Sequence, residues 1–121
     1  MKIIRSKESK VQEYSKEIRR YYLFKDFRIV HTILFPEDQQ DFHTHKKILE
    51  ATYIIKGNIE VITETEKKPI TLKKNDLIIF FPNELHMIRN SSKKSSEIIT
   101  FKKIYEEDDY NELFDNDKNI C

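Results

Sequence analysis

The stretch His43-Thr44-His45-Lys46-Lys47-Ile48-Leu49-Glu50 decides how this sequence is interpreted, and six further residues separate it from the only glycine, Gly57. Two residues apart on an extended strand, His43 and His45 point to the same side, about 6.6 Å apart along the chain. Glu50 begins the next apolar run and could bring a carboxylate to the same centre. Imidazole and carboxylate groups suit a divalent metal ion. The stretch therefore indicates a metal site on a β-protein.

A second stretch, Asn75-Asp76-Leu77-Ile78-Ile79-Phe80-Phe81-Pro82, is followed after three residues by His86 and after three more by Asn90. His86 lies on a much later predicted strand and could enter the same centre from the opposite sheet. Four ligands on a six-coordinate ion leave two positions for water or a small molecule. Without thiolates the set favours Fe, Mn, Ni, Co or Zn in an open site over a closed structural zinc site. A net charge of about +1 would favour an anionic or enolisable oxygen ligand.

Taken together, the two stretches resemble the cupin superfamily and match both of its signature motifs across residues 43–90. The resemblance implies an all-β fold, the double-stranded β-helix or jelly-roll-type barrel. It also implies one bound divalent metal ion. By analogy the ligands are His43, His45, Glu50 and His86, while Gly57, Pro82 and Asn90 shape the two motifs.

Three glycines of the cupin pattern are replaced in this chain. Asn75 and Asn83 stand at two of these positions, and asparagine tolerates the left-handed backbone better than most residues. Glu37 stands at the third and predicts that the loop before His43 takes another shape.

Length and charge exclude several classes of protein. A chain of 121 residues is expected to form one domain, here 1–121. Its 22 basic and 21 acidic residues nearly cancel, which gives no reason to expect nucleic acid or an anionic membrane as partner. No apolar run approaches the roughly 20 residues of a membrane span. The single cysteine, Cys121, allows no internal disulfide, so a soluble cytoplasmic protein is expected.

The parts of the chain outside the motifs predict a helical arm, a barrel and a tail. Apolar residues at helical spacing (Val11, Tyr14, Ile18 and Tyr21) predict a helix over Lys7–Phe24, within an arm spanning 1–25 that could form a homodimer interface. Alternation over 27–35 predicts a strand ended by Pro36. Further strands of a barrel over 26–105 are predicted near 40–45, 50–56, 59–65, 69–72, 77–81, 85–90 and 97–104. The acidic segment 106–121 predicts a short terminal helix followed by a frayed end.

The function remains open between two classes. The superfamily that the chain resembles includes dioxygenases, sugar isomerases, decarboxylases, lyases and non-enzymatic sensors. One hypothesis is a metalloenzyme of dioxygenase, isomerase or lyase type that transforms a small oxygen-rich molecule, with the metal as Lewis acid or oxygen activator. The alternative is a non-catalytic, metal-dependent sensor or binding module. His31, on the strand before the motif, could reach the pocket as a supporting proton donor, or it could be a satisfied interior or interface histidine. No other catalytic residue is assigned.

Overall fold

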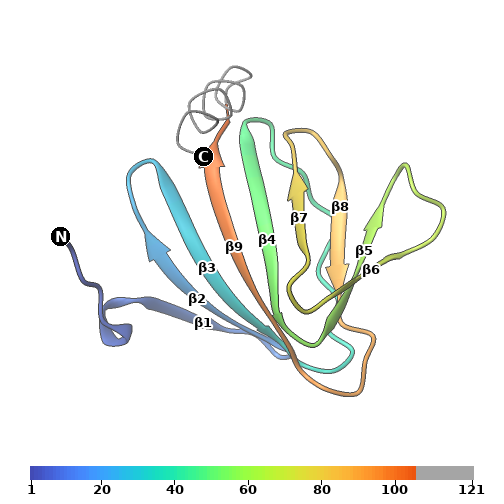
Figure 1. Ribbon diagram of the computed structural model, residues 1–121, viewed down its shortest axis with the longest axis horizontal. Helices are drawn as coiled ribbons and strands as arrows, with labels where there is room; N and C mark the ends of the chain where they lie inside the picture. The colour runs from blue at the N-terminus through green and yellow to red at the C-terminus, as the bar shows by residue number, and fades with distance from the viewer. Residues whose placement is uncertain (106–121) are drawn as a thin grey trace, which may run out of the picture.

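The computed structural model describes residues 1–105, and these residues form nine strands and one short 3-10 helix in two antiparallel sheets. The larger sheet has the strand order β1-β2-β3-β9-β4-β7 and the smaller has the order β6-β5-β8 (Figure 1). The all-β fold expected from the sequence is thereby confirmed. The elements are η1 Ser6–Glu8, β1 Lys10–Glu13, β2 Glu17–Leu23, β3 Phe27–Leu34, β4 Ile48–Lys56, β5 Asn58–Thr63, β6 Ile70–Lys73, β7 Leu77–Phe80, β8 His86–Arg89 and β9 Ser96–Ile104.

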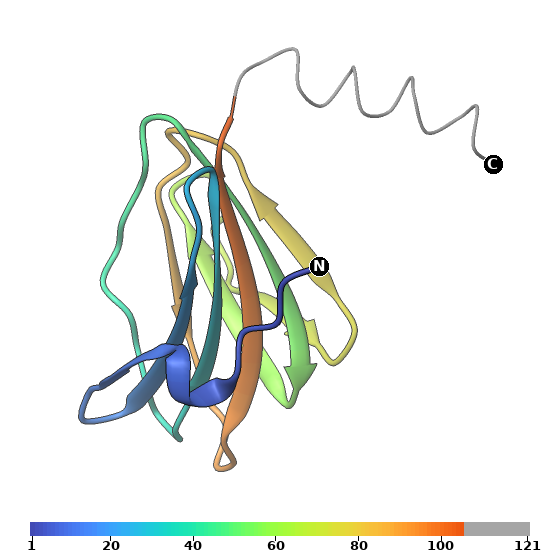
Figure 2. The same ribbon diagram turned by 90° about the vertical axis from the view of Figure 1, so that its left-hand side faces the viewer.

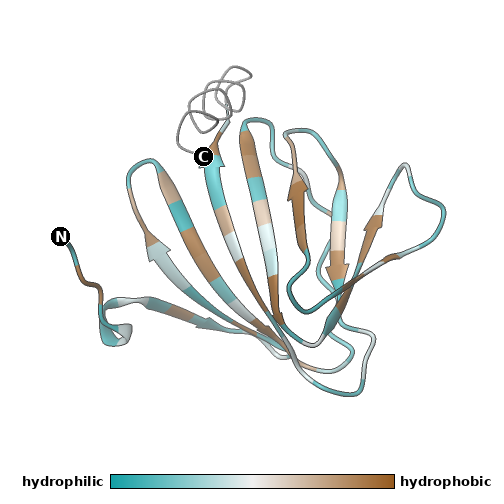
Figure 3. Cartoon of the chain, in the orientation of Figure 1, coloured by the Kyte–Doolittle hydropathy of each residue, from teal (hydrophilic) through white to brown (hydrophobic). Residues whose placement is uncertain are grey.

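The hydrophobic core lies between the two sheets and follows from the alternation of side chains along the strands. On β3, Val30, Thr32 and Leu34 are buried, as the period of two requires. Figure 3 shows the corresponding hydrophobic and hydrophilic bands along β3 and β4. Burying each large aliphatic side chain contributes about 1.5–3 kcal/mol. The core cluster consists of Leu34, Ile54, Ile59, Val61, Phe80, Ile88 and Ile98.

The helix predicted over Lys7–Phe24 is wrong, because this segment forms the β1–β2 hairpin. Strand β2 pairs with β3 along its whole length, from Glu17 opposite Leu34 to Leu23 opposite Arg28. The cross-strand hydrogen bonds and side-chain pairs stabilise the hairpin more than a helix would be stabilised by a stripe of only four apolar residues. Two members of that predicted stripe, Val11 and Tyr14, are exposed, so the stripe is not a buried face. The main sheet therefore starts before residue 26.

The connection between β3 and β4 is a long loop, where a strand over 40–45 was expected. It runs beside the smaller sheet (Figure 2) and meets it at two isolated bridges, Gln39 with Arg89 and His43 with His86. The loop thus carries His43 and His45 beside β8. The other predicted strands from 50 to 104 are present with small shifts of their ends.

Four of the residues in 1–105 have a left-handed backbone, and all four stand at positions where the cupin pattern has glycine. The φ angles are 76° at Gly57, 75° at Asn75, 70° at Asn83 and 66° at Glu37. The asparagines behave as predicted. At Glu37 the backbone keeps the conformation that glycine favours, so the predicted change of loop shape does not extend to this dihedral angle.

Within residues 1–105, the structure contains no helix long and apolar enough to cross a membrane. The predicted C-terminal helix falls in 106–121, outside the described residues.

Replacing Gly57 by alanine should lower the free energy of unfolding by about 1–3 kcal/mol, because a side chain in this backbone region is strained. An added Cβ would also lie 2.5 Å from Ser96 Oγ, whose hydroxyl donates to the Asn58 carbonyl at 2.7 Å. Urea denaturation measures the change. The matched control is Asn83→Gly, which should be within about 0.5 kcal/mol of the wild type because glycine accepts the same φ. An alanine variant as stable as the wild type would contradict the strain.

Candidate metal centre

Glu50 is the buried charge around which the site is built. It lies on β4 between β9 and β7, and alternation turns Glu50, Thr52 and Ile54 into the space between the sheets while Tyr53 faces outward. Glu50 is only 4% exposed. A carboxylate in such a place needs compensating partners.

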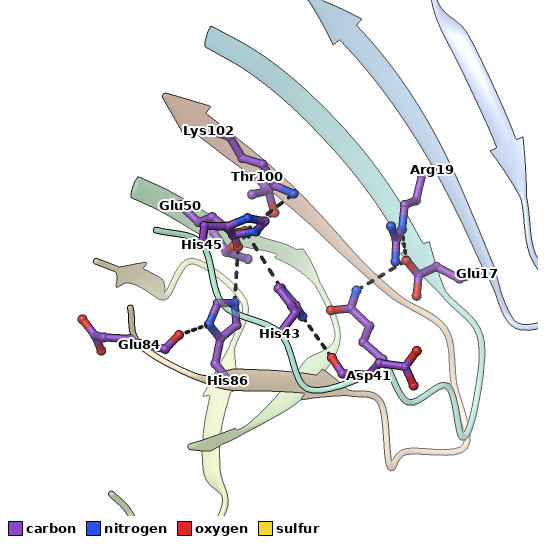
Figure 4. Close-up of polar contacts among 12 residues, drawn as sticks. Glu17, Arg19, Asp41, His43, His45, Glu50, Glu84, His86, Thr100 and Lys102 are labelled. Carbon is purple, nitrogen blue, oxygen red and sulfur yellow. Dashed lines mark hydrogen bonds and ion pairs between the residues drawn. The ribbon is translucent and has the colours of Figure 1, made fainter. Parts of the chain in front are cut away.

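Three histidines approach this carboxylate from two other segments (Figure 4). His45 Nε2 is 2.6 Å from Glu50 Oε1, and His43 Nε2 is 3.9 Å from the same oxygen. His86, on β8 of the smaller sheet, places its Nε2 3.4 Å from Glu50 Oε2. The backbones of His43 and His86 exchange two hydrogen bonds of 3.0 Å, which holds the loop against β8. All four predicted ligand residues therefore meet at one place.

The four residues do not meet symmetrically. One ligand atom each from His43, His45 and Glu50 lies within 4.8 Å of the others, so these three could hold one metal ion. His86 faces the second carboxylate oxygen instead. Its ring stacks on Phe80, with 3.7 Å between centroids and 3° between planes, which fixes its orientation.

Backbone carbonyls determine which ring nitrogen carries the hydrogen in two of the histidines. His43 Nδ1 lies 2.9 Å from the Asp41 carbonyl oxygen, and His86 Nδ1 lies 2.9 Å from that of Glu84. Because a carbonyl only accepts hydrogen bonds, each Nδ1 carries the hydrogen and a neutral ring keeps its lone pair on Nε2. The lone pairs are then directed at Glu50, which is also an acceptor.

This arrangement leaves buried polar atoms without hydrogen-bond partners. Within residues 1–105, the buried atoms that lack a hydrogen-bond partner include His45 Nε2, His86 Nε2 and Glu50 Oε1. Such groups are costly to bury unless something satisfies them. A cation held by His43, His45 and Glu50 would satisfy His45 Nε2 and Glu50 Oε1, so this set of ligands fits a divalent metal ion.

The electrostatics keep these groups in the forms that bind metal. Burial disfavours the charged form of Glu50, but neighbouring groups that include the Lys102 ammonium outweigh it and lower the pKa of this carboxyl to about 2. Burial is also the main cause that lowers the pKa of His43, and the neighbouring His86 acts in the same direction. At neutral pH Glu50 is therefore ionised and His43 is neutral.

A cavity of about 300 Å³ is lined by His43, His45 and Glu50, and it brings in two cations that the sequence analysis did not assign to the site, Arg19 and Lys102. Lys102 Nζ is 3.6 Å from Glu50 Oε1, and β9 places Lys102 directly opposite Glu50. Neither residue belongs to a motif, and Arg19 lies in the segment predicted as a helix. The cavity is lined by Arg19, Tyr21, Val30, Thr32, Gln40, Asp41, His43, His45, Glu50, Ile88, Ile98, Thr100 and Lys102.

His31 is placed away from this cavity. The lining residues contributed by β3 are its neighbours Val30 and Thr32, and alternation turns His31 to the other face. There His31 Nε2 is 3.1 Å from Glu97 Oε2. This geometry matches the alternative interpretation, a histidine satisfied by a neighbouring side chain.

A pair of buried carboxyl groups lies at the Arg19 side of the cavity. Glu17 on β2 and Asp38 in the loop are 4% and 7% exposed. Arg19 Nε bonds to Glu17, and Asp38 Oδ2 has no hydrogen-bond partner among residues 1–105. Burial, followed by the adjacent Glu17, raises the pKa of Asp38 to about 7, although Arg19 opposes the shift. One of the two acids is thus protonated at mildly acid pH.

Comparisons with known proteins relate this architecture to others. The family model described as "Cupin domain" matches residues 30–102. No curated protein matches the chain. One similar solved structure is KdgF from Halomonas sp., at 17% identity and a TM-score of 0.74, covering 89% of this chain and 97% of that one. A predicted oxalate decarboxylase from Thermotoga maritima has 20% identity and a TM-score of 0.74, with 86% and 100% covered.

A third similar structure is the Cupin_2 domain of an XRE family transcriptional regulator from Enterobacter cloacae. It has 19% identity and a TM-score of 0.65, with 76% of this chain and 100% of that one covered. At these identities the likeness shows the fold alone.

The buried acid pair predicts a pH-dependent effect of Asp38→Asn. Folded Asp38 has a pKa of about 7 against an ordinary value of 3.8, so between these values the folded state holds a proton that the unfolded state releases. The free energy of unfolding of the wild type therefore loses a contribution as pH rises through this window. The variant lacks this loss. Its stability relative to the wild type should rise by about 2–4 kcal/mol from pH 4.5 to pH 8, measured by urea denaturation.

Glu17→Gln is the companion variant, because it removes the carboxylate that faces Asp38 and should weaken the same pH dependence. A difference between Asp38→Asn and the wild type that is constant from pH 4.5 to pH 8 would show that Asp38 titrates normally.

Proposed function

The chain belongs to the cupin family, and we propose that it uses one divalent metal ion to bind and transform a small oxygen-rich molecule. The proposed ligands are His43, His45, Glu50 and His86. Imidazole and carboxylate donors suit Fe, Mn, Ni, Co or Zn. Similar structures whose names include a small molecule, such as the predicted oxalate decarboxylase, support this class of ligand.

The single observation that carries this proposal is the set of buried polar atoms without hydrogen-bond partners. Each unsatisfied buried group costs about 1–3 kcal/mol. His45 Nε2, His86 Nε2 and Glu50 Oε1 belong to different segments, yet all three are directed to one place. A metal-free barrel would retain these costs, and Lys102 would offset them only at Glu50.

The chain's own residues would prepare a ligand for reaction. When bound, the metal supplies Lewis-acid or oxygen-activating chemistry at positions that the protein leaves open. The Asp41 and Glu84 carbonyls hold His43 and His86 with their Nε2 lone pairs toward the centre. Val30, Ile88 and Ile98 form an apolar wall that limits water beside the site. Lys102 contributes a positive charge next to Glu50.

The alternative is a metal-dependent binding or sensor module without catalysis. The similarity to a cupin domain of a transcriptional regulator supports this class. An assay panel distinguishes the enzyme from the binding module. It contains small acids, sugar phosphates and diketones, each tested with every metal, with and without oxygen. Turnover that depends on the metal supports an enzyme, whereas binding without turnover across the panel supports the module.

A cytoplasmic location and a homodimer are also part of the proposal. Analytical ultracentrifugation of the full chain tests the dimer, and a monomer at micromolar concentration would contradict it.

Metal binding should depend on the four ligand residues. The untagged wild-type chain should bind one divalent ion, and His86→Ala and Glu50→Gln should each weaken its affinity at least about 100-fold, because each removes a ligand of the ion. Isothermal titration with the five candidate ions, together with elemental analysis of the purified protein, measures this.

The matched control is His31→Ala, which removes a histidine outside the cavity and should leave metal affinity within about 2-fold. Circular dichroism confirms that each variant is folded. An unchanged stoichiometry and affinity in both His86→Ala and Glu50→Gln would refute the proposed centre.

A further inference from the structure

We propose that the buried acid pair Asp38–Glu17 holds the loop carrying His43 and His45 in place through a shared proton, so that loss of this proton loosens the loop and weakens metal binding. The pair joins the loop between β3 and β4 to strand β2, and neither acid lines the cavity. This inference rests on the metal centre proposed above for one of its two readouts. It adds two positioning residues that lie outside the centre.

Asp38 stands where the loop passes from the main sheet to the smaller sheet. Its N–H donates to the Phe35 carbonyl at 3.1 Å, and its carbonyl accepts the Asn90 N–H at 2.8 Å. Two residues later the Gln40 N–H donates to a carbonyl of β8 at 3.0 Å, and the bridge of His43 to β8 follows. The backbone from Asp38 to His43 is therefore a short bonded path along β8, and the position of Asp38 determines where this path starts.

The side chain of Asp38 connects this path to β2. A side-chain hydrogen bond joins Asp38 to Glu17, and Gln40 Nε2 from the same loop donates to Glu17 Oε1 at 3.4 Å. Two carboxylates have no hydrogen to share, so the bond between the acids exists only while one of them is protonated. A proton also gives a partner to the pair at the place where Asp38 Oδ2 has none among residues 1–105.

The charges around the pair favour one proton over none. Arg19 Nε bonds to Glu17 and takes up its charge (Figure 4), so ionisation of Asp38 would leave one buried negative charge without a cation of its own. From the smaller sheet, Arg89 faces the loop at Gln39 but is paired with Glu60 at 3.2 Å. The other charged residues of the loop and of the adjoining turns are exposed, namely Glu37, Asp41, Lys46, Lys47, Lys16, Lys93 and Lys94.

The pair changes state close to neutral pH. Burial and the adjacent Glu17 raise the pKa of Asp38 to about 7. Because this pKa is raised in the folded chain, the proton stabilises the loop below it, and the stabilisation is lost as pH rises through about 7. The proton then passes to solvent, the hydrogen bond is broken, and the two carboxylates repel each other. A loop that samples more conformations has its histidines in place for a smaller fraction of the time, which lowers metal affinity in proportion.

The sign of the effect separates this mechanism from direct electrostatics. An ionised Asp38 attracts a cation through space, which by itself would raise metal affinity as pH increases. At physiological ionic strength this attraction is largely screened beyond roughly 8 Å. A loosened loop acts in the opposite direction.

The first test compares the metal affinity of the full wild-type chain with that of Asp38→Asn by isothermal titration at pH 6 and pH 8. The asparagine amide donates to Glu17 at both pH values and does not ionise. The two affinities should agree within about 2-fold at pH 6, and the variant should bind at least about 5-fold more tightly at pH 8. Protonation of the histidines affects both chains and cancels in their ratio. Asp26→Asn, in the exposed bend between β2 and β3, is the matched control and should keep a constant ratio to the wild type.

Two further variants test the shared proton itself. Asp38→Ala removes the donor at every pH and should weaken metal binding at least about 5-fold already at pH 6, where Asp38→Asn does not. In Glu17→Gln the amide can donate to an ionised Asp38, so the affinity relative to the wild type should again increase from pH 6 to pH 8. A role of Asp38 in packing alone would weaken both Asp38 variants equally at both pH values.

The second readout needs no metal. Amide hydrogen exchange of the metal-free wild type should show protection of the Gln40 and His43 N–H groups that falls at least about 5-fold from pH 6 to pH 8, after correction for the intrinsic exchange rate. In Asp38→Asn this protection should stay constant. Equal protection in both chains at both pH values overturns the inference, and so does a wild type that binds metal as tightly as Asp38→Asn, or more tightly, at pH 8. A chain that binds no metal overturns the proposed centre, and the exchange of the loop then decides the role of the acid pair by itself.

Discussion

An ionised carboxylate buried between two sheets is the constraint on which the rest of this structure depends. Glu50 is 4% exposed and keeps a pKa of about 2 despite its burial. Because an isolated buried charge is expensive, Glu50 needs a positive partner, and the lone pairs that His43 and His86 direct at it need the same partner. Lys102 comes from the neighbouring strand, His43 and His45 come from a loop, and His86 comes from the opposite sheet. The site is thus a consequence of compensating one charge.

The loop between β3 and β4 is what lets the two sheets share this charge. It is tied to β8 by the bridges at Gln39 and His43, and the Asp38 carbonyl accepts the Asn90 N–H at 2.8 Å. The buried side chain of Asn90 donates to the carbonyls of Leu34 and Lys94. Backbone groups that would otherwise be unsatisfied between the sheets are paired in this way. The asparagine of the second motif therefore supports the loop that carries the histidines of the first.

The alternation of apolar residues was sufficient for most strands and insufficient at the N-terminus. Over 27–34 and 48–56, one face of each strand is buried, so a period of two is visible in the sequence. Strand β2 is half-buried along most of its length, because its polar residues also face the cavity or a neighbour. Its pattern therefore resembled a short helical stripe, and only its pairing with β3 distinguishes the two.

The sequence by itself determined the chemical types at the centre, because the residue types and their spacing within each motif are local properties of the chain. It predicted His43, His45, Glu50 and His86 as one set, and the left-handed turns at Asn75 and Asn83. Only the tertiary structure decided that Arg19 and Lys102 complete the cavity and that His31 lies outside it. It also decided which histidine nitrogens face Glu50. Strand partners and backbone acceptors come from distant segments, and no local spacing encodes which segments meet.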